Sequence, residues 1–243
     1  MSINLITGNE DAKRAVVNQL RMNKSSGTYL FYGKKGAYLK EFALAFAKGI
    51  NCNESVHDFC DKCRVCENIN KEIYSDLHII SASEGTVKID QIRELIKNAS
   101  ETSYEMGKKV FIIEDVNKLR KEASNALLKI IEEPPKDTYF ILLANSLNIL
   151  PTIKSRSLAI EIQKLTYEEL GVEESLYNFF LGDVKDIREF KSGAYTLSKE
   201  SYKNTAIYMK EYLETGEFLP KIRAYGALED FILEKNYLSE IDK

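Results

Sequence analysis

The sequence predicts an α/β fold, a doubly wound parallel sheet of five strands followed by a small all-helical region. Five short runs of β-branched and aromatic residues are continuously apolar, as strands are when helices cover both faces of a sheet. Amphipathic helical patterns separate these runs, which implies right-handed crossovers between parallel strands. After about residue 165 the strand pattern stops and only helical patterns remain.

The expected strands are 29–32, 77–80, 110–114, 139–144 and 158–162. A helix is expected after the first strand, where Phe42 and Phe46 share one face. Further helices are expected at 90–97 and 122–133, the second ended by two prolines that cannot continue it.

Thr166 is a helix-capping residue at the start of the C-terminal region. Beyond it, 199–213 and 221–233 are mostly helical in pattern. We therefore expect a core domain at 1–165 and a helical region at 166–243.

Composition excludes several classes of protein. The 243 residues carry 34 basic and 37 acidic side chains, and a net charge of −3 argues against a general polyanion binder, although not against a local basic patch. No apolar run reaches membrane-spanning length, and the N-terminus lacks a signal-peptide pattern. We expect a cytoplasmic protein that does not contact the membrane.

The first strand leads through a glycine turn into a helix, as in a phosphate-binding loop. A working loop reads GxxxxGK[ST]: the lysine reaches the terminal phosphates and the hydroxyl binds magnesium. With Gly33 as first glycine, and Gly36 within the loop, Tyr38 replaces the second glycine, Leu39 the lysine and Lys40 the hydroxyl residue. The octapeptide alone also suits an ordinary turn, but its context favours a disabled phosphate loop.

Acidic and amide side chains follow two other strands. Glu114 and Asp115 end the third strand, where an ATPase of this type carries aspartate and then glutamate, so the order is reversed. Asn145 ends the fourth strand and can orient water or phosphate. Taken alone, Glu114 and Asp115 are better explained as solvated acids at a strand end, whereas for Asn145 the two explanations are about equal. Together with the loop they form a vestigial nucleotide site.

The four cysteines, Cys52, Cys60, Cys63 and Cys66, form one cluster with the spacing C-x7-C-x2-C-x2-C. Four thiolates complete a tetrahedral shell, which favours a structural zinc ion with no place for a catalytic water. An iron–sulfur cluster uses the same ligands and stays an alternative, and a redox CxxC would leave Cys52 unexplained. His57 is not needed as a ligand.

Arg156 lies in the tripeptide Ser-Arg-Ser that precedes the last predicted strand. A planar guanidinium suits the stabilisation of a leaving phosphoryl group on a neighbouring subunit. An isolated arginine is more often a solvated surface residue, so only its motif singles it out.

These elements together resemble the delta-prime and gamma/tau family of clamp-loader subunits of bacterial DNA polymerase III, which are AAA+ proteins. The resemblance covers residues 3–165. Its segments are 6–9, the cysteine insert 52–66, 75–80, 87–95, 110–119, 122–129, 132–135 and 150–157.

The resemblance implies an AAA+ core with a zinc insert and a helical lid. It also implies a catalytically silent, delta-prime-like subunit without a functional ATP site, in a ring of five with gamma/tau and delta subunits. Arg156 matches the family's arginine finger, which acts in trans on a gamma/tau ATP site during loading of the sliding clamp onto primer-template DNA. The 78 residues of 166–243 are too few for a lid and the family's three-helix collar, so we expect a collar that is absent or truncated.

Two other functions remain open from sequence. One is an active AAA+ ATPase of gamma/tau type with an unusual loop, against which the missing loop lysine argues. The other is a zinc-bearing nucleic-acid-binding protein, against which the acidic charge balance argues.

Overall fold

The computed structural model describes residues 3–34, 36–82, 86–105, 107–180 and 182–192. The chain divides into two compact units, 1–34 with 38–163, and 35–37 with 164–243. The helices expected at 199–213 and 221–233 lie outside the described residues. Among the helices that the structure describes, none is long and apolar enough to span a lipid bilayer.

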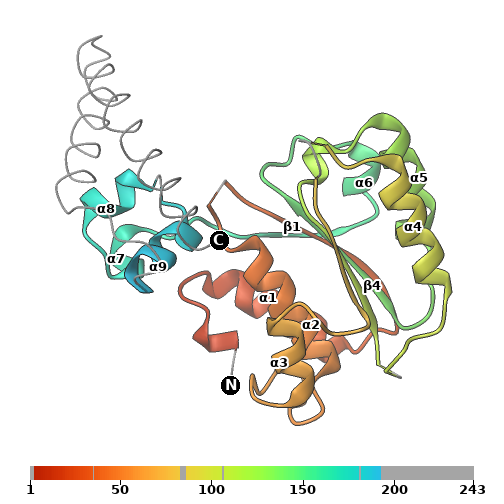
Figure 1. Cartoon of the computed structure of the whole chain (residues 1–243), viewed down its shortest axis with the longest axis horizontal. Coiled ribbons are helices and arrows are strands. Elements are labelled where there is room, and N and C mark those ends of the chain that lie inside the picture. Colours follow the sequence, from red (N-terminus) through yellow and green to blue (C-terminus); the bar gives the residue numbers. More distant parts are fainter. Residues whose placement is uncertain (1–2, 35, 83–85, 106, 181, 193–243) are drawn as a thin grey trace, which may run out of the picture. The chain divides into compact units, whose positions relative to one another are not determined.

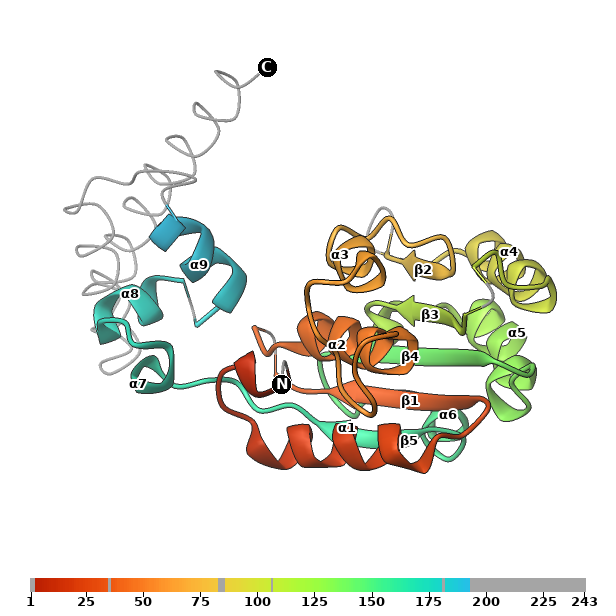
Figure 2. The same cartoon turned by 90° about the horizontal axis from the view of Figure 1, so that it is seen from below.

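The first unit contains one parallel sheet. Its strands are β1 (Gly27–Tyr32), β2 (Leu77–Ile80), β3 (Lys109–Ile113), β4 (Thr138–Ala144) and β5 (Leu158–Glu161). They lie in the order β2-β3-β4-β1-β5, which can be followed from top to bottom in Figure 2. This confirms the predicted five-stranded parallel sheet. Because β1 lies between β4 and β5, the chain changes direction across the sheet there. In open α/β sheets, ligands bind outside the carboxyl ends of the strands at such a point, a place that we call the crevice.

Helices cover both faces of the sheet. The first unit has α1 (Glu10–Met22), α2 (Leu39–Asn51), α3 (Arg64–Asn70), α4 (Ile89–Ser100), α5 (Lys121–Glu132), α6 (Pro151–Lys154) and the 3-10 turns η1 (Ile3–Leu5) and η2 (Val116–Lys118). Helices α1, α2 and α3 lie on one side of the sheet, and α4 and α5 lie on the other (Figure 1). The sequence pattern does not predict α1 and α3.

Alternation along the strands divides the core between these two helical layers. On one side, Leu30, Phe111 and Phe140 pack with apolar residues of α4 and α5, and the two phenylalanine rings stack with centroids 5.3 Å apart. On the other side, Tyr29 packs on Phe46 of α2 with ring centroids 4.6 Å apart. Strands β3 and β4 are buried along their whole length, as their continuous apolar runs predict. Strand β5 differs, because three of its four residues are exposed and only Ile160 is buried.

The carboxyl ends of β1, β3 and β4 meet at one edge of the sheet. Strand β1 continues into the loop, where the Gly33 amide donates to the Ala144 carbonyl of β4 at 3.1 Å. Glu114 follows β3, and its amide donates to the Ile80 carbonyl of β2 at 2.8 Å. The sheet therefore brings three strand tips, and the polar side chains just beyond them, to the same edge.

The second unit begins with three short helices, α7 (Tyr167–Leu170), α8 (Glu174–Phe179) and α9 (Val184–Ser192). Thr166 caps α7 as predicted: its hydroxyl accepts from the Glu169 amide at 3.3 Å, and its amide donates to the Glu169 carboxylate at 2.9 Å. Leu176, Phe180 and Ile187 form a small apolar cluster within this unit.

Candidate functional site

In the loop after β1, Leu39 stands at the position that a lysine occupies in the sequence pattern of a phosphate loop. Gly36 has φ +88°, a conformation that favours glycine. Helix α2 then begins at Leu39, so this side chain lies at the helix N-terminus, where the lysine of a working loop would stand. Tyr38 is 2% exposed and Leu39 is 8% exposed. The two residues that replace the glycine and the lysine are therefore packed into the protein and present no positive charge.

Lys40, the residue after Leu39 on α2, carries a positive charge that is paired with two carboxylates. Its Nζ lies 2.8 Å from Oε1 of Glu72 and 3.3 Å from Oε1 of Glu114. Burial alone would lower the pKa of Lys40, but the hydrogen bonds and charges of these carboxylates outweigh it and raise the pKa. The structure thus joins the residue at the hydroxyl position of the loop to the acid at the end of β3. Sequence reasoning missed Glu72, which shares no motif with either residue.

Asp115 has a separate set of partners. It adopts a left-handed conformation with φ 53°, and Lys118 Nζ lies 2.9 Å from its Oδ2. Asn145 donates through Nδ2 to Oδ1 of Asp115 at 3.0 Å, so the structure brings these two predicted residues together. The backbone amide of Asn145 in turn donates to Oδ1 of Asn117 at 2.9 Å, a contact that no motif indicated.

All four carboxylate oxygens at the end of β3 therefore have protein partners. The second oxygen of Glu114 accepts a short hydrogen bond from the Ser81 hydroxyl, and the two oxygens of Asp115 are bonded to Asn145 and Lys118. A divalent cation would have to compete with the two lysine ammonium groups for the charge of these carboxylates. The positive charge in this crevice is supplied by lysine side chains of the chain itself.

Arg156 lies elsewhere, directly after α6. Its Nε donates to Oε2 of Glu132 at 2.8 Å, and its Nη1 donates to the Thr152 carbonyl at 3.1 Å. The side chain retains 30% of its exposure. Its partners thus come from the ends of α5 and α6 and not from the group around Lys40. Sequence reasoning missed Glu132 as a partner, although the resemblance included its Glu-Glu-Pro-Pro segment.

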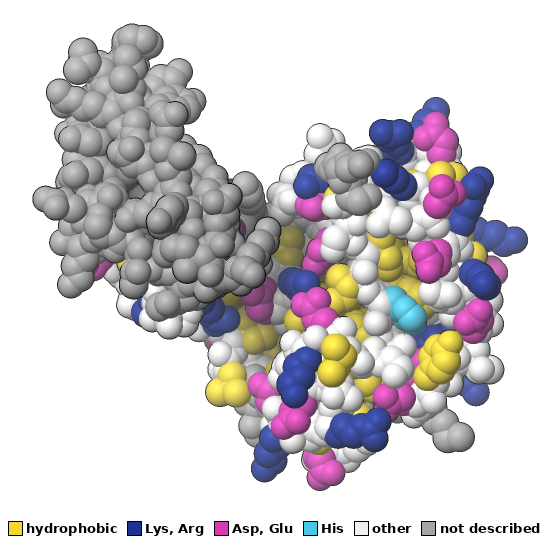
Figure 3. Space-filling model, viewed as in Figure 1, with side chains coloured by type: hydrophobic (Ala, Val, Ile, Leu, Met, Phe, Trp, Pro, Cys, Tyr) yellow, Lys and Arg dark blue, Asp and Glu magenta, His cyan; other side chains and the backbone are white. Residues whose placement is uncertain are grey.

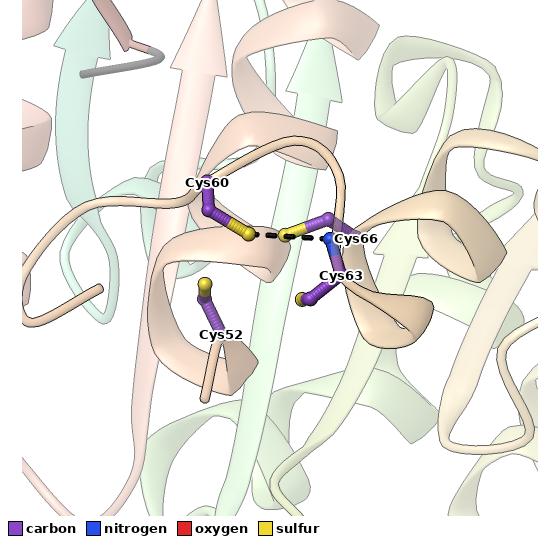
Figure 4. Close-up of side chains that lie close together, drawn as sticks. All are labelled: Cys52, Cys60, Cys63 and Cys66. Atoms are coloured by element: carbon purple, nitrogen blue, oxygen red, sulfur yellow. Dashed lines mark hydrogen bonds between the residues drawn. The ribbon is translucent and has the colours of Figure 1, made fainter. Parts of the chain in front are cut away.

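The four cysteines converge at one point, as Figure 4 shows. Cys52 follows α2, Cys60 lies in the connecting loop, Cys63 caps α3 and Cys66 lies within α3. Their sulfur atoms all lie within 4.8 Å of one another. Four sulfurs around one zinc ion at 2.3 Å would be about 3.8 Å apart, so this donor set fits a tetrahedral thiophilic metal. The four cysteines can bind a metal such as zinc.

Burial, backbone hydrogen bonds and neighbouring sulfurs shift the pKa values of the thiols. Burial raises the pKa of the Cys66 thiol, and the neighbouring sulfur of Cys52 raises it further. Backbone hydrogen bonding at Lys62 lowers the pKa of Cys60 to about 7. Four thiolates at this spacing would repel one another strongly without a cation between them.

Neighbouring side chains hold the cysteine loop in place. Buried Lys48 lies 2.6 Å from Oδ1 of Asp61 and 4.1 Å from the centroid of the Phe59 ring. The ring nitrogen Nδ1 of His57 lies 3.0 Å from the Leu20 carbonyl of α1. His57 therefore anchors the loop to α1 and is partly buried, not fully solvated as a loop histidine would be.

The sequence matches the family described as "DNA polymerase III, delta subunit" over residues 8–166, well over half of the chain. The chain belongs to this clamp-loader AAA+ family. Among curated relatives, DNA polymerase III subunit delta-prime of Bacillus subtilis is 35% identical over 153 residues, covering 63% of this chain and 46% of the relative. The tau subunit of the same organism is 35% identical over 170 residues, covering 68% of this chain and 30% of the relative.

The clamp-loader fold is also found among solved structures. A DNA polymerase III gamma subunit-related protein from Thermotoga maritima superposes with a TM-score of 0.50 at 16% identity, covering 88% of this chain and 76% of that one. This likeness concerns the fold alone. The chain spans less than half the length of the curated clamp-loader relatives named above.

Charge on the visible face of this family member is mixed. In Figure 3, basic and acidic side chains of the described residues are interspersed and not sorted into a patch of one sign. Such a face lacks the clustered basic side chains that nonspecific phosphate binding requires.

Proposed function

We propose that this chain is a non-hydrolysing, delta-prime-like subunit of a cytoplasmic clamp loader. It works in a hetero-pentamer with gamma/tau and delta subunits that loads the sliding clamp onto primer-template DNA. Residues 1–165 act as its AAA+ core, with residues 52–66 as a metal-binding insert, and residues 166–243 act as the helical lid region.

The ion pair between Lys40 and Glu114 supports the proposal that the chain does not hydrolyse ATP. In a working site, a loop hydroxyl and a carboxylate at the end of this strand share one magnesium ion. Here the residues at those two positions are bonded to each other at 3.3 Å. The ammonium group of Lys40 takes the electrostatic place of the metal, and Leu39 offers no charge to the terminal phosphates. The chain therefore does not hydrolyse ATP.

The second part of the proposal is a trans role, in which Arg156 acts on the ATP site of a neighbouring subunit. A guanidinium stabilises the charge of a transferring phosphoryl group when it approaches from a neighbouring subunit. Arg156 is partly exposed, is held at two nitrogens and lies outside its own crevice. These features suit a donor to the ATP site of a gamma/tau subunit.

The cysteine cluster carries a structural role. Its four sulfurs fill a tetrahedral shell and leave no ligand position for a reacting water. We assign it to zinc, which would fasten the loop between α2 and α3 and so support the position of Glu72 just after α3.

The alternative function is that of an active ATPase of gamma/tau type. The observation that favours it is the 35% identity to the Bacillus subtilis tau subunit, which equals the identity to its delta-prime subunit. Overall similarity thus does not separate the two functions, and the chemistry of the loop has to do so.

ATP turnover by a reconstituted assembly tests the proposal. This chain is mixed with gamma/tau and delta subunits, and hydrolysis is compared between wild type and Arg156→Ala. We expect about a 10³-fold loss at the site that Arg156 serves, because arginine fingers contribute on that order. Arg93→Ala, which removes an exposed arginine paired with Asp90 on the same helix, is the matched control and should leave turnover unchanged.

Two outcomes would contradict the proposal. Unchanged turnover with Arg156→Ala would remove the trans role. Turnover by the isolated chain that disappears in Glu114→Gln would establish the active ATPase instead.

A further inference from the structure

We propose that Glu132 is a positioning residue that aims Arg156 at the neighbouring subunit's nucleotide; this inference rests on the proposed trans role of Arg156. The observation that carries it is the way in which the guanidinium is held. Two of its three nitrogens, Nε and Nη1, donate hydrogen bonds, and the third, Nη2, is left for a ligand.

A guanidinium is a rigid plane with five N–H donors, so fixing two of its nitrogens fixes the direction of the third. Nε of Arg156 donates to Glu132, and Nη1 donates to the Thr152 carbonyl at 3.1 Å and to the Ser155 hydroxyl at 3.5 Å. Within the part of the chain that the structure describes, Nη2 has no hydrogen-bond partner. Glu132 therefore orients the plane without covering the edge that would meet a phosphoryl oxygen.

The position of Glu132 is unfavourable for the helix that carries it. It is the last residue of α5, and a carboxylate at a helix C-terminus lies against the negative end of the helix dipole. The Glu132 side chain is 54% exposed. Its ion pair with Arg156 is therefore too weak to offset much of this unfavourable interaction with the helix dipole. Stability alone thus gives little reason for an acid here, whereas orientation of Arg156 does.

The ends of both helices provide a rigid base for this arrangement. Glu132 is followed by a helix cap and two prolines, and Thr152 lies in α6, which begins with Pro151 and packs against α5. The acceptors on the two helices thereby hold the guanidinium from two sides. A small displacement of either acceptor would turn Nη2 away, and misplacement of about 1 Å can cost on the order of 100-fold in rate.

The test compares Glu132→Ala, Glu132→Gln and the control Glu133→Ala in the assembly with gamma/tau and delta subunits. Glu133 is the adjacent acid and is exposed. We expect Glu132→Ala to lower kcat about tenfold at the ATP site that Arg156 serves, with KM for ATP unchanged. Glu132→Gln should lose less, because its amide oxygen still accepts from Nε, and Glu133→Ala should match wild type.

A double-mutant cycle separates positioning from a general structural effect. In an Arg156→Ala background, Glu132→Ala should cause no further loss, and the melting temperature of each variant should stay close to its parent. If Arg156→Ala slows the assembly and Glu132→Ala does not, the positioning role is wrong and the trans role stands. A full additional loss in the Arg156→Ala background would likewise overturn it. Unchanged turnover with Arg156→Ala would overturn both.

Discussion

The crevice beside the loop after β1 and the cysteine cluster both contain side chains that could bind a metal ion, and they differ in how their charges are balanced. In the crevice, Glu114 is paired with Lys40, and Asp115 is paired with Lys118. In the cluster, four sulfurs lie within 4.8 Å of one another, and the nearby Lys48 is paired with Asp61 and not with a thiolate. The first site contains lysines that balance its carboxylates, whereas the proposed role of the second requires a cation from solution.

This difference shows that ligand-type residues alone do not define a metal site. Carboxylates suit magnesium, and thiolates suit zinc, but the charge that remains unbalanced after folding decides whether an ion binds. The crevice is therefore expected to exclude magnesium, and the cluster is expected to take up zinc.

The largest expected effect comes from dismantling the cluster. Cys66→Ser removes a buried ligand, so the protein should lose its zinc and more than about 4 kcal/mol of unfolding free energy. Metal analysis of the purified chain should give about one zinc per wild-type chain and much less for the variant. Urea unfolding measures the loss of stability.

The matched control for this change is His57→Ala. His57 lies in the same loop but contacts the Leu20 carbonyl, so its removal should leave the zinc content unchanged. A wild-type chain that contains no metal and has four reactive thiols would contradict the assignment, as would zinc loss in His57→Ala.

A smaller effect is expected from breaking the charge balance of the crevice. Lys40→Met should reduce the unfolding free energy by no more than about 1 kcal/mol, because the pair is partly exposed. The pKa of Lys40 is raised by Glu72 and Glu114, so its contribution is fully present at neutral pH. It should disappear as pH rises above the ordinary lysine value of 10.5 and through the raised pKa.

Urea unfolding at pH 7 and at alkaline pH checks this prediction. Lys34→Met is the control, since Lys34 is an exposed lysine in the same loop. If the difference in unfolding free energy between wild type and Lys40→Met grew with pH, the interpretation of the ion pair would be wrong.

Sequence reasoning predicted the parts of this molecule that depend on local pattern. All five strands lie where continuous apolar runs predict them, and the capping of Thr166 was predicted correctly. The cysteine spacing predicted a cluster that the structure does bring together. These features depend on residues that are close in sequence or share one periodicity.

The partners of the site residues could not be predicted in this way. Glu132 meets Arg156 across 24 residues, and Asn117 meets Asn145 across 28. Each pair forms only because the sheet places separate connections side by side, and none of the partners has a distinctive residue type. Helix α3 was missed for a related reason, since its seven residues are too short to show a period.

Equilibrium binding of ATP with magnesium to the isolated wild-type chain tests the central claim most directly. Leu39 has no charge to bind the terminal phosphates, and Lys40 neutralises Glu114. We therefore expect calorimetric titration to detect no magnesium-dependent ATP binding at up to about 1 mM nucleotide. This limit corresponds to a binding free energy weaker than about −4 kcal/mol. Magnesium-dependent binding with a micromolar Kd would contradict the account.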